Sequence, residues 1–309
     1  MYSRRDFLKN SSAVALGSFV LSCKTHHAVS ATGIIGRPAG VQLYTAMSII
    51  DADTKGTLQK IAQIGYKEIE SAFSRKGGYY GMKPKEFATM VKDQGMTWRS
   101  HHTVGAPFRR PPNANPPTGA DGKPMTMPVV KNLKENYQEL VDDAAEGGLS
   151  YLVCSSIPVS TMDEIKTAVD VFNKTGEACK KAGVQFAYHN HTTEFDQVEG
   201  NRPFDYILSN TDKDLVKMEL DLAWATKAGQ NPVDLFNSHP GRFPLWHVKD
   251  LDKTSQKPVE VGAGYIDFKP IFANAEKAGM KYYFVEQDGA PQPIENLARS
   301  FENLKKVVV

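Results

Sequence analysis

The sequence is short of cysteine, of excess charge and of long apolar runs. Its 309 residues include three cysteines, too few for a disulfide framework. The 37 Lys and Arg nearly balance the 35 Asp and Glu, so a formal net charge of +2 creates no basic field of the kind that dominates nucleic-acid affinity. Past the N-terminal segment, no apolar run reaches the ~18 residues that span a bilayer. These absences exclude a disulfide-stapled scaffold and a membrane-spanning domain, and they argue against a nucleic-acid partner.

The composition is that of an enzyme with a sizeable core. Hydrophobic residues make up 41% of the chain and charged residues 23%, which excludes a disordered protein. The length allows two domains, but an α/β barrel of roughly 250 residues is commonly one domain. We expect a single domain over residues 31–309.

The N-terminus resembles a twin-arginine export signal. The run S-R-R-D-F-L-K at residues 3–9 precedes a short apolar stretch at 13–21, which fits a signal peptide better than a membrane span. V-L-S-C at 20–23 is similar to a bacterial lipobox, in which Cys23 is acylated and becomes the mature N-terminus. Residues 1–22 hold three basic residues and one acidic residue, so the mature chain has a formal net charge of zero. We expect a periplasmic protein or a membrane-anchored lipoprotein, with residues 1–30 outside the fold.

Eight strand-like runs are separated by helical periods. The strands are predicted from β-branched and aromatic runs bounded by turn residues, at 41–45, 66–71, 97–102, 151–156, 185–191, 216–222, 244–250 and 282–288. Helices are predicted over 129–147, 161–182, 268–278 and 293–307 among others. Strands that alternate with helices form right-handed βαβ units, and eight units close into a (β/α)₈ TIM barrel of the α/β class. A doubly wound open sheet is the alternative, although no Gly-rich dinucleotide turn is present.

Metal-competent residues gather where the predicted strands end. This is the face of a barrel that carries chemistry, and its polar set comprises Glu70, His102, His189, His191, Asp221, His247 and Glu286. Because side chains alternate along a strand, His247 and Lys249 point the same way, as do Glu286 and Asp288. Two imidazoles and two carboxylates neutralise a divalent ion such as Mn, Zn, Fe or Co, whereas histidine makes Mg less suitable. We expect the ion to be bound by His189, Asp221, His247 and Glu286.

Several motifs resemble the sugar phosphate isomerase/epimerase family of the xylose isomerase-like barrel superfamily. They are YHNHTTEF, ELDLAWATKAG, GRFPLWHVKD, VGAGYIDFKPIF and YYFVEQD, and the resemblance covers nearly all of the chain from residue 40. It implies a barrel and a divalent metal held by Glu, Asp, His and Glu from strands five to eight. Asp221, His247 and Glu286 match three of these ligands. His189 departs from the pattern, because it stands where the epimerases have a carboxylate that is both a ligand and a proton-transfer base.

The resemblance also implies roles for the residues around the metal. Glu70 and His102 match polar residues that line the substrate pocket, and we expect Lys249 and Trp224 to contact substrate as well. Glu286 matches the family's catalytic base, with His189 or His191 as the proton donor or orienting group. We expect the substrate to be a keto-sugar or a related small carbohydrate.

The reaction expected of such a site begins with removal of a proton next to a carbonyl, which gives an enediolate. Return of the proton isomerises or epimerises the sugar, whereas loss of a β-substituent makes the enzyme a lyase or dehydratase. His189 disfavours epimerisation by two carboxylates and suits elimination. Two other classes stay open: a sugar-binding lipoprotein without turnover, and an endonuclease IV-like phosphodiesterase. That nuclease requires a His where this chain has Trp224.

Two further features have weaker consequences. Residues 103–128 form a Pro- and Gly-rich stretch too long for a simple loop, and we expect it to cover the active site with Phe108, Arg109 and Arg110. The alternative is an insertion with no role. Cys154 and Cys179 are expected to be buried free thiols rather than a bridge or a nucleophile.

Overall fold

The structure is a computed structural model that describes residues 36–107 and 130–307. The described residues belong to one compact unit. Eight parallel strands close into a barrel in the order β1-β10-β7-β6-β5-β4-β3-β2. The predicted TIM barrel is confirmed, and closure excludes the open sheet. The predicted signal at residues 1–30 lies outside the described residues, as does most of the predicted cover at 103–128.

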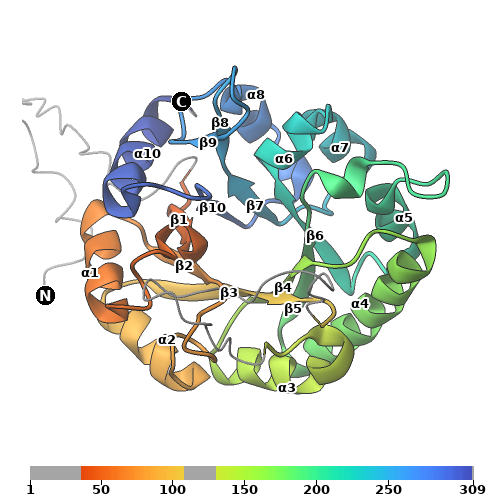
Figure 1. The fold of residues 1–309 in the computed structure, drawn as a ribbon, viewed down its shortest axis with the longest axis horizontal. Helices are drawn as coiled ribbons and strands as arrows, with labels where there is room; N and C mark the ends of the chain where they lie inside the picture. Colours follow the sequence, from red (N-terminus) through yellow and green to blue (C-terminus); the bar gives the residue numbers. More distant parts are fainter. Residues whose placement is uncertain (1–35, 108–129, 308–309) are drawn as a thin grey trace, which may run out of the picture. The chain divides into compact units, whose positions relative to one another are not determined.

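Figure 1 looks into the barrel, with the helices arranged around the strands. The barrel strands are β1 (Gly40–Gln42), β2 (Glu68–Ser71), β3 (Thr97–Val104), β4 (Tyr151–Ser156), β5 (Gln185–His189), β6 (Val216–Asp221), β7 (Leu245–Val248) and β10 (Tyr282–Val285). A short antiparallel pair, β8 (Asp250–Leu251) and β9 (Pro258–Val259), follows β7. All eight predicted barrel strands are therefore present.

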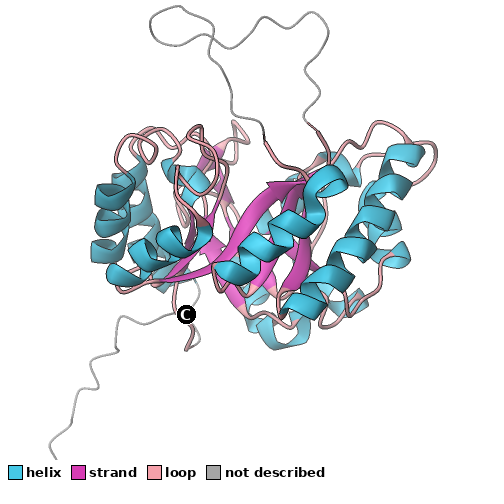
Figure 2. Cartoon of the chain, turned by 90° about the horizontal axis from the view of Figure 1, so that it is seen from below, coloured by secondary structure: helices cyan, strands magenta, loops and turns pink. Residues whose placement is uncertain are grey.

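The side view in Figure 2 shows the helices outside the strands. The α-helices are α1 (Thr54–Ile64), α2 (Pro84–Asp93), α3 (Leu133–Glu146), α4 (Met162–Ala182), α5 (Pro203–Asn210), α6 (Leu222–Lys227), α7 (Pro232–Ser238), α8 (Phe268–Ala273), α9 (Ala275–Ala278) and α10 (Pro293–Val307). Short 3₁₀ helices, η1 (Leu43–Ala46) and η2 (Thr193–Phe195), complete the set. Among residues 36–107 and 130–307, no helix is long and apolar enough to cross a bilayer.

Capping residues fix the ends of the longest helix. The side chain of Thr161 accepts a hydrogen bond from Glu164 N at the start of α4. Gly183 ends α4 in the left-handed region at φ 75°, a conformation that glycine adopts without a steric penalty. The predicted helix over 161–182 is thereby reproduced almost residue for residue.

Two element boundaries differ from the prediction. The first strand ends at Gln42 rather than at residue 45, because the Gln42 side chain accepts a hydrogen bond from Tyr44 N and starts η1. The single helix predicted over 268–278 is divided into α8 and α9 at Asn274. Asn favours such breaks, since its short polar side chain competes for backbone hydrogen bonds.

The barrel interior has an apolar layer beneath a polar layer. Tyr151, Val153, Ala187, Leu245 and Phe284 form a separate buried cluster. Side chains alternate along a strand, so residues two positions further on reach the same interior at a higher level. Ala187 is thus followed by His189, Leu245 by His247 and Phe284 by Glu286. The alternation of side chains along each strand therefore places the candidate ligands directly above this apolar cluster.

Candidate functional site

The polar layer is buried and centred on strands β5, β6, β7 and β10. His189 ends β5, Asp221 ends β6, His247 is in β7, and Glu286 directly follows β10. Asp221 and His247 are register partners on adjacent strands. The exposed fractions of these four residues lie between 0 and 5%. The structure therefore brings together the four residues predicted from the sequence to bind a metal.

Their donor atoms converge on one oxygen of Asp221. His189 Nε2 lies 4.0 Å and His247 Nδ1 lies 3.9 Å from Asp221 Oδ2, and His247 Nδ1 is 2.7 Å from Glu286 Oε2. The other Asp221 oxygen caps α6 by accepting a hydrogen bond from Trp224 N at 2.8 Å. Because Oδ1 is used to cap the helix, Oδ2 is the Asp221 oxygen that faces the other site residues.

The lysine of the seventh strand end supplies a cation to these carboxylates. Lys249 Nζ lies 3.1 Å from Asp221 Oδ2, 2.8 Å from Glu286 Oε2 and 2.6 Å from Asp288 Oδ2. The ammonium also lies 4.7 Å from the centre of the Trp224 ring, within the range of a cation–π contact. Lys249 and Trp224, both predicted to contact substrate, are thus neighbours at the edge of the ligand set.

A second group lies on the other side of His247. His247 Nε2 is 2.6 Å from Glu70 Oε1 and 3.2 Å from Glu219 Oε2. His102 Nε2 is 2.6 Å from Glu219 Oε2 and 3.1 Å from Glu70 Oε1. The ring of His191 contacts the ring of His189, with centroids 4.9 Å apart. Every residue predicted for the site therefore lies in or beside one cluster.

Glu219 is the buried site residue that sequence reasoning missed. It lies in β6 two positions before Asp221, and its exposed fraction is 0%. The signal was present, because two acidic residues spaced by two on one strand face the same side. The ligands predicted from the sequence lie at or next to strand ends, whereas Glu219 lies two positions before the end of its strand and so deeper in the barrel.

Mutual burial sets the charge state of the cluster. Burial opposes protonation of His102, but Glu70 and Glu219 raise its pKa to about 9. Burial and the neighbouring His247 hold the pKa of His189 well below its usual value. Burial would raise the pKa of Glu286, but Lys249 and His247 lower it, so that Glu286 is ionised. The site thus combines an ionised Glu286 with a neutral His189, whereas burial and the neighbouring Glu70 raise the pKa of Glu219 to about 7.

The donor set fits a divalent cation. Asp221, His247 and Glu286 offer ligand atoms within 4.8 Å of one another, and so do His102, His189, Glu219 and His247. Asp221 Oδ2 and Glu219 Oε1 are buried carboxylate oxygens that make no hydrogen bond within the described part of the chain. Such oxygens are costly to bury without a cation, and Asp221 Oδ2 shares the Lys249 ammonium with two other carboxylates. Nitrogen and oxygen donors of this kind suit Zn, Mn, Fe or Co.

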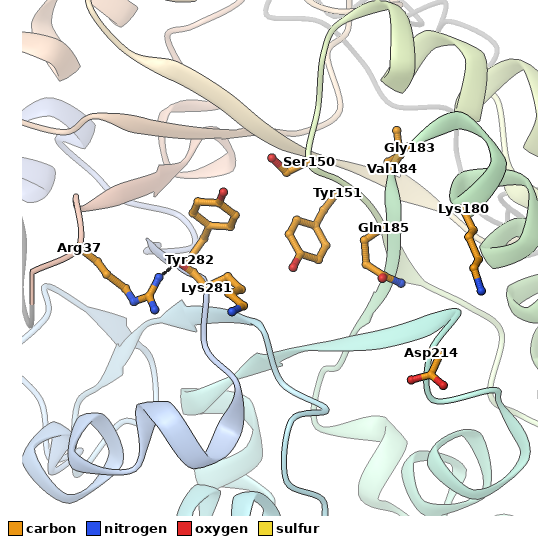
Figure 3. A pocket seen from close by; sticks show the side chains of 10 residues that line it. All are labelled: Arg37, Ser150, Tyr151, Lys180, Gly183, Val184, Gln185, Asp214, Lys281 and Tyr282. Atoms are coloured by element: carbon orange, nitrogen blue, oxygen red, sulfur yellow. Dashed lines mark hydrogen bonds between the residues drawn. The ribbon is translucent and has the colours of Figure 1, made fainter.

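The opposite mouth of the barrel has a hollow of a different character. A cavity of about 590 Å³ lies at the N-terminal ends of β4, β5 and β10, and Figure 3 shows Arg37, Tyr151, Gln185, Lys281 and Tyr282 around it. Arg37 donates a hydrogen bond to the backbone oxygen of Lys281, and Gln185 donates to Leu215 O. Its lining contains no histidine and only one carboxylate, so it offers no metal-ligand set.

Comparison with known proteins identifies the family. Residues 58–307 match the xylose isomerase-like TIM barrel family. The chain belongs to this family. A solved sugar phosphate isomerase/epimerase from Parabacteroides distasonis is 29% identical, covers 91% of this chain and 97% of its own, and superposes with a TM-score of 0.71. The IolI protein with a bound zinc atom shares the fold at 16% identity and a TM-score of 0.65, covering 88% of this chain and 98% of its own.

Curated relatives are dehydratases. Inosose dehydratase of Geobacillus thermodenitrificans is 26% identical over 153 residues, which cover 43% of this chain and 51% of that protein. Inosose dehydratase of Lacticaseibacillus casei is 25% identical over 167 residues, which cover 48% of this chain and 55% of that protein. This chain spans about half the length of the curated relatives it matches. Its family, and its similarity both to inosose dehydratases and to a sugar phosphate isomerase/epimerase, indicate that this chain is an enzyme.

Proposed function

We propose that this protein is a divalent-metal-dependent isomerase or epimerase of a keto-sugar or related small carbohydrate. The observation that carries the proposal is that Asp221, His247 and Glu286 offer buried ligand atoms within 4.8 Å of one another, with His189 Nε2 4.0 Å from Asp221 Oδ2. A bound divalent ion would polarise a substrate carbonyl and its neighbouring hydroxyl and so acidify the intervening C–H bond. A similar barrel, the IolI protein, holds a zinc atom, which is consistent with a divalent metal in this fold.

The chain's own residues supply the proton transfers. Glu286 is ionised and serves as the base that takes the proton from carbon. His189 or His191 serves as the group that returns a proton. We place the substrate beside Lys249 and Trp224, whose ammonium and indole ring lie at the edge of the ligand set. Glu70 and His102 line the same end of the barrel.

Elimination is the second candidate reaction, and one substitution favours it. His189 stands where a second proton-transfer carboxylate is expected from family resemblance, and an imidazole suits donation of a proton to a leaving oxygen. Dehydratases among the relatives are consistent with this chemistry. In that case, loss of a β-hydroxyl follows removal of the proton by Glu286, and the products are an unsaturated ketone and water.

One experiment addresses both candidates. Protein purified from its native export pathway is analysed for metal and then incubated with a panel of free keto-sugars in D₂O. We expect one divalent ion per chain and deuterium incorporation next to the carbonyl of at least one sugar. A new enone absorbance would select elimination, whereas deuterium without dehydration would select isomerisation or epimerisation.

The ligand assignment is tested by Asp221→Ala and His247→Ala. Each is expected to abolish metal binding and exchange together. One ion per chain in both variants would overturn the site and the proposed function with it.

We further propose that the protein acts outside the cytoplasm. The proposal rests on the twin-arginine pattern at residues 3–9 and the V-L-S-C sequence ending at Cys23. An exported enzyme meets free sugars or glycoside breakdown products rather than cytoplasmic sugar phosphates. Mass spectrometry of the native protein should find a mature terminus at or near Cys23, and an intact Met1 terminus would contradict export.

A further inference from the structure

Each histidine of the proposed ligand set has one ring nitrogen within hydrogen-bond distance of a buried carboxylate that is not a proposed ligand. His247 Nε2 lies 2.6 Å from Glu70 Oε1, and His189 Nδ1 lies 3.2 Å from Glu219 Oε2. The opposite ring nitrogens, His247 Nδ1 and His189 Nε2, both face Asp221 Oδ2. His189 therefore has Nδ1 on a carboxylate and Nε2 toward the proposed metal position. His247 has Nε2 on Glu70, while its Nδ1 lies 2.7 Å from Glu286 Oε2, an oxygen of a proposed ligand.

We propose that Glu70 and Glu219 are positioning residues that fix the tautomer and orientation of His247 and His189 for metal binding. A neutral imidazole has one N–H group, and the carboxylate that accepts it decides which nitrogen keeps its lone pair. An N–H group bound to a carboxylate also makes the other nitrogen a stronger metal donor. The inference rests on the proposed function and deepens it.

The Glu70 carboxylate is positioned to accept a hydrogen bond from the Nε2–H group of His247. It is fully buried, and it accepts hydrogen bonds from Gln42 Nε2 at 2.8 Å and from Ser100 Oγ at 2.5 Å. Gln42 and Ser100 are also its register partners on β1 and β3. Neighbouring strands thus hold Glu70 in place before any metal arrives.

His102 connects the two carboxylates. Its Nε2 atom is 2.6 Å from Glu219 Oε2 and 3.1 Å from Glu70 Oε1, so one N–H group is shared between them. The His102 ring stacks on His247, with centroids 5.1 Å apart and an angle of 8° between the planes. The sequence predicted substrate contact for Glu70 and His102, whereas this geometry assigns them to the support of the metal ligands.

The competing interpretation is that Glu219 is itself a ligand. Glu219, His102, His189 and His247 have donor atoms within 4.8 Å of one another, which suggests a second ion on the Nε2 side of His247. That position requires lone pairs on His247 Nε2 and His102 Nε2. Both nitrogens lie 2.6 Å from a carboxylate oxygen, a distance that calls for a proton between the two atoms. The position between Asp221, His247 and Glu286 displaces a proton only from His247 Nδ1, and the oxygen 2.7 Å from that nitrogen belongs to Glu286, itself a proposed ligand. The positioning role therefore keeps the protons on His247 Nε2 and His102 Nε2.

The test measures Co²⁺ binding to the whole protein by competition with a chromophoric chelator. The variants are Glu70→Gln and Glu219→Gln, and the matched control is Glu68→Gln. Glu68 is a buried carboxylate of the same strand as Glu70, but it pairs with Arg99 instead of a histidine. We expect one ion per chain throughout, with a 10- to 100-fold weaker affinity in the two site variants and a change of less than twofold in the control.

Two spectroscopic readouts do not depend on turnover. The visible spectrum of bound Co²⁺ should change in the site variants, because the histidine ligands are reoriented, and should stay unchanged in Glu68→Gln. In ¹⁵N-histidine spectra, metal-free wild type should show His189 protonated on Nδ1, and zinc-loaded wild type should show His247 protonated on Nε2. Glu219→Asp, which keeps the charge, should retain the His189 tautomer better than Glu219→Gln.

Three results would overturn the proposal. They are unchanged affinity and spectra in both site variants, zinc bound to His247 through Nε2, or two ions in the wild type with one lost in Glu219→Gln. If the wild type binds no divalent ion, the proposed function fails instead. The His189 tautomer in the metal-free protein then decides the positioning role of Glu219 separately.

Discussion

Lys249 Nζ lies 2.8 Å from Glu286 Oε2, deep in a site that offers its oxygens to a metal. The same ammonium is 3.1 Å from Asp221 Oδ2, and the exposed fraction of Lys249 is 1%. Burial alone would lower the pKa of Lys249, but Asp221 and Glu286 raise it well above its usual value. Lys249 therefore neutralises two proposed ligands in the metal-free protein.

The first prediction is that Lys249→Met destabilises the metal-free protein more than the metal-loaded protein. Removal of one partner from a buried ion pair leaves an uncompensated charge and costs about 3–5 kcal/mol. A bound divalent ion would compensate Asp221 and Glu286 in place of the ammonium. We expect the difference in Tm between metal-free and metal-loaded protein to be larger in Lys249→Met than in the wild type.

The control for this prediction is Lys227→Met. Lys227 also lies over the Trp224 ring, at 5.1 Å, but it is exposed and its ammonium donates a hydrogen bond to the backbone oxygen of Gln256. Its substitution should leave both Tm values nearly unchanged. An equal loss of Tm in metal-free and metal-loaded Lys249→Met would contradict the neutralising role.

The second prediction separates chemistry from metal binding at Glu286. In Glu286→Gln, the amide keeps the shape of the side chain but cannot take up a proton. We expect the variant to retain part of its metal and to lose the chemical step by about 10² or more, measured as kcat for deuterium exchange. Glu276→Gln, on the exposed side of α9, serves as the control. Near-normal kcat in Glu286→Gln would assign the base elsewhere.

The strand ends were predictable from sequence because barrel strands are buried on both faces and appear as short runs of β-branched and aromatic residues bounded by turn residues. His189, Asp221 and His247 each end or nearly end a short apolar strand, and parallel strands bring such ends to one face. Closure then follows from eight βα units. The fold, and the gathering of the four candidate ligands at one end of the barrel, could therefore be predicted without knowledge of any side-chain contact.

Support for the ligands could not be predicted in the same way. The contact between Glu70 and His247 joins β2 to β7, and the contact between His102 and Glu219 joins β3 to β6. These pairs face each other across the barrel, and no spacing in the sequence relates them. They depend on barrel diameter and side-chain length, which only the assembled structure provides.

The third prediction concerns the two buried thiols. Cys154 and Cys179 are free and buried, as the sequence predicted. Burial raises the pKa of both thiols, that of Cys179 to about 12, so little thiolate forms at pH 8. We expect neither thiol to react with a disulfide reagent in the native protein, and both to react in denaturing urea. Because an unmodified Cys23 would add a third thiol, the measurement uses Cys23→Ser, and rapid native labelling of that variant would contradict the prediction.

The final prediction concerns the loop that follows Lys249. The carboxylate of Asp250 accepts hydrogen bonds from the backbone nitrogens of Gly262 at 2.9 Å, Gly264 at 3.0 Å and Ile266 at 3.2 Å. A Cβ atom on Gly264 would collide with the Asp250 carboxylate and with the backbone oxygen of Leu251. Gly264→Ala should therefore break this hydrogen-bond set and strain the chain beside the site.

We expect Gly264→Ala to lower the free energy of unfolding by about 1–3 kcal/mol, the usual cost of overpacking, measured by urea denaturation. Metal affinity should fall with it, because Asp250 adjoins Lys249 and the strand that carries His247. Ala263→Ser, an exposed change in the same loop, should affect neither quantity. Full stability in Gly264→Ala would mean that the loop adjusts freely, and Asp250 would then have no part in holding the lysine against Glu286.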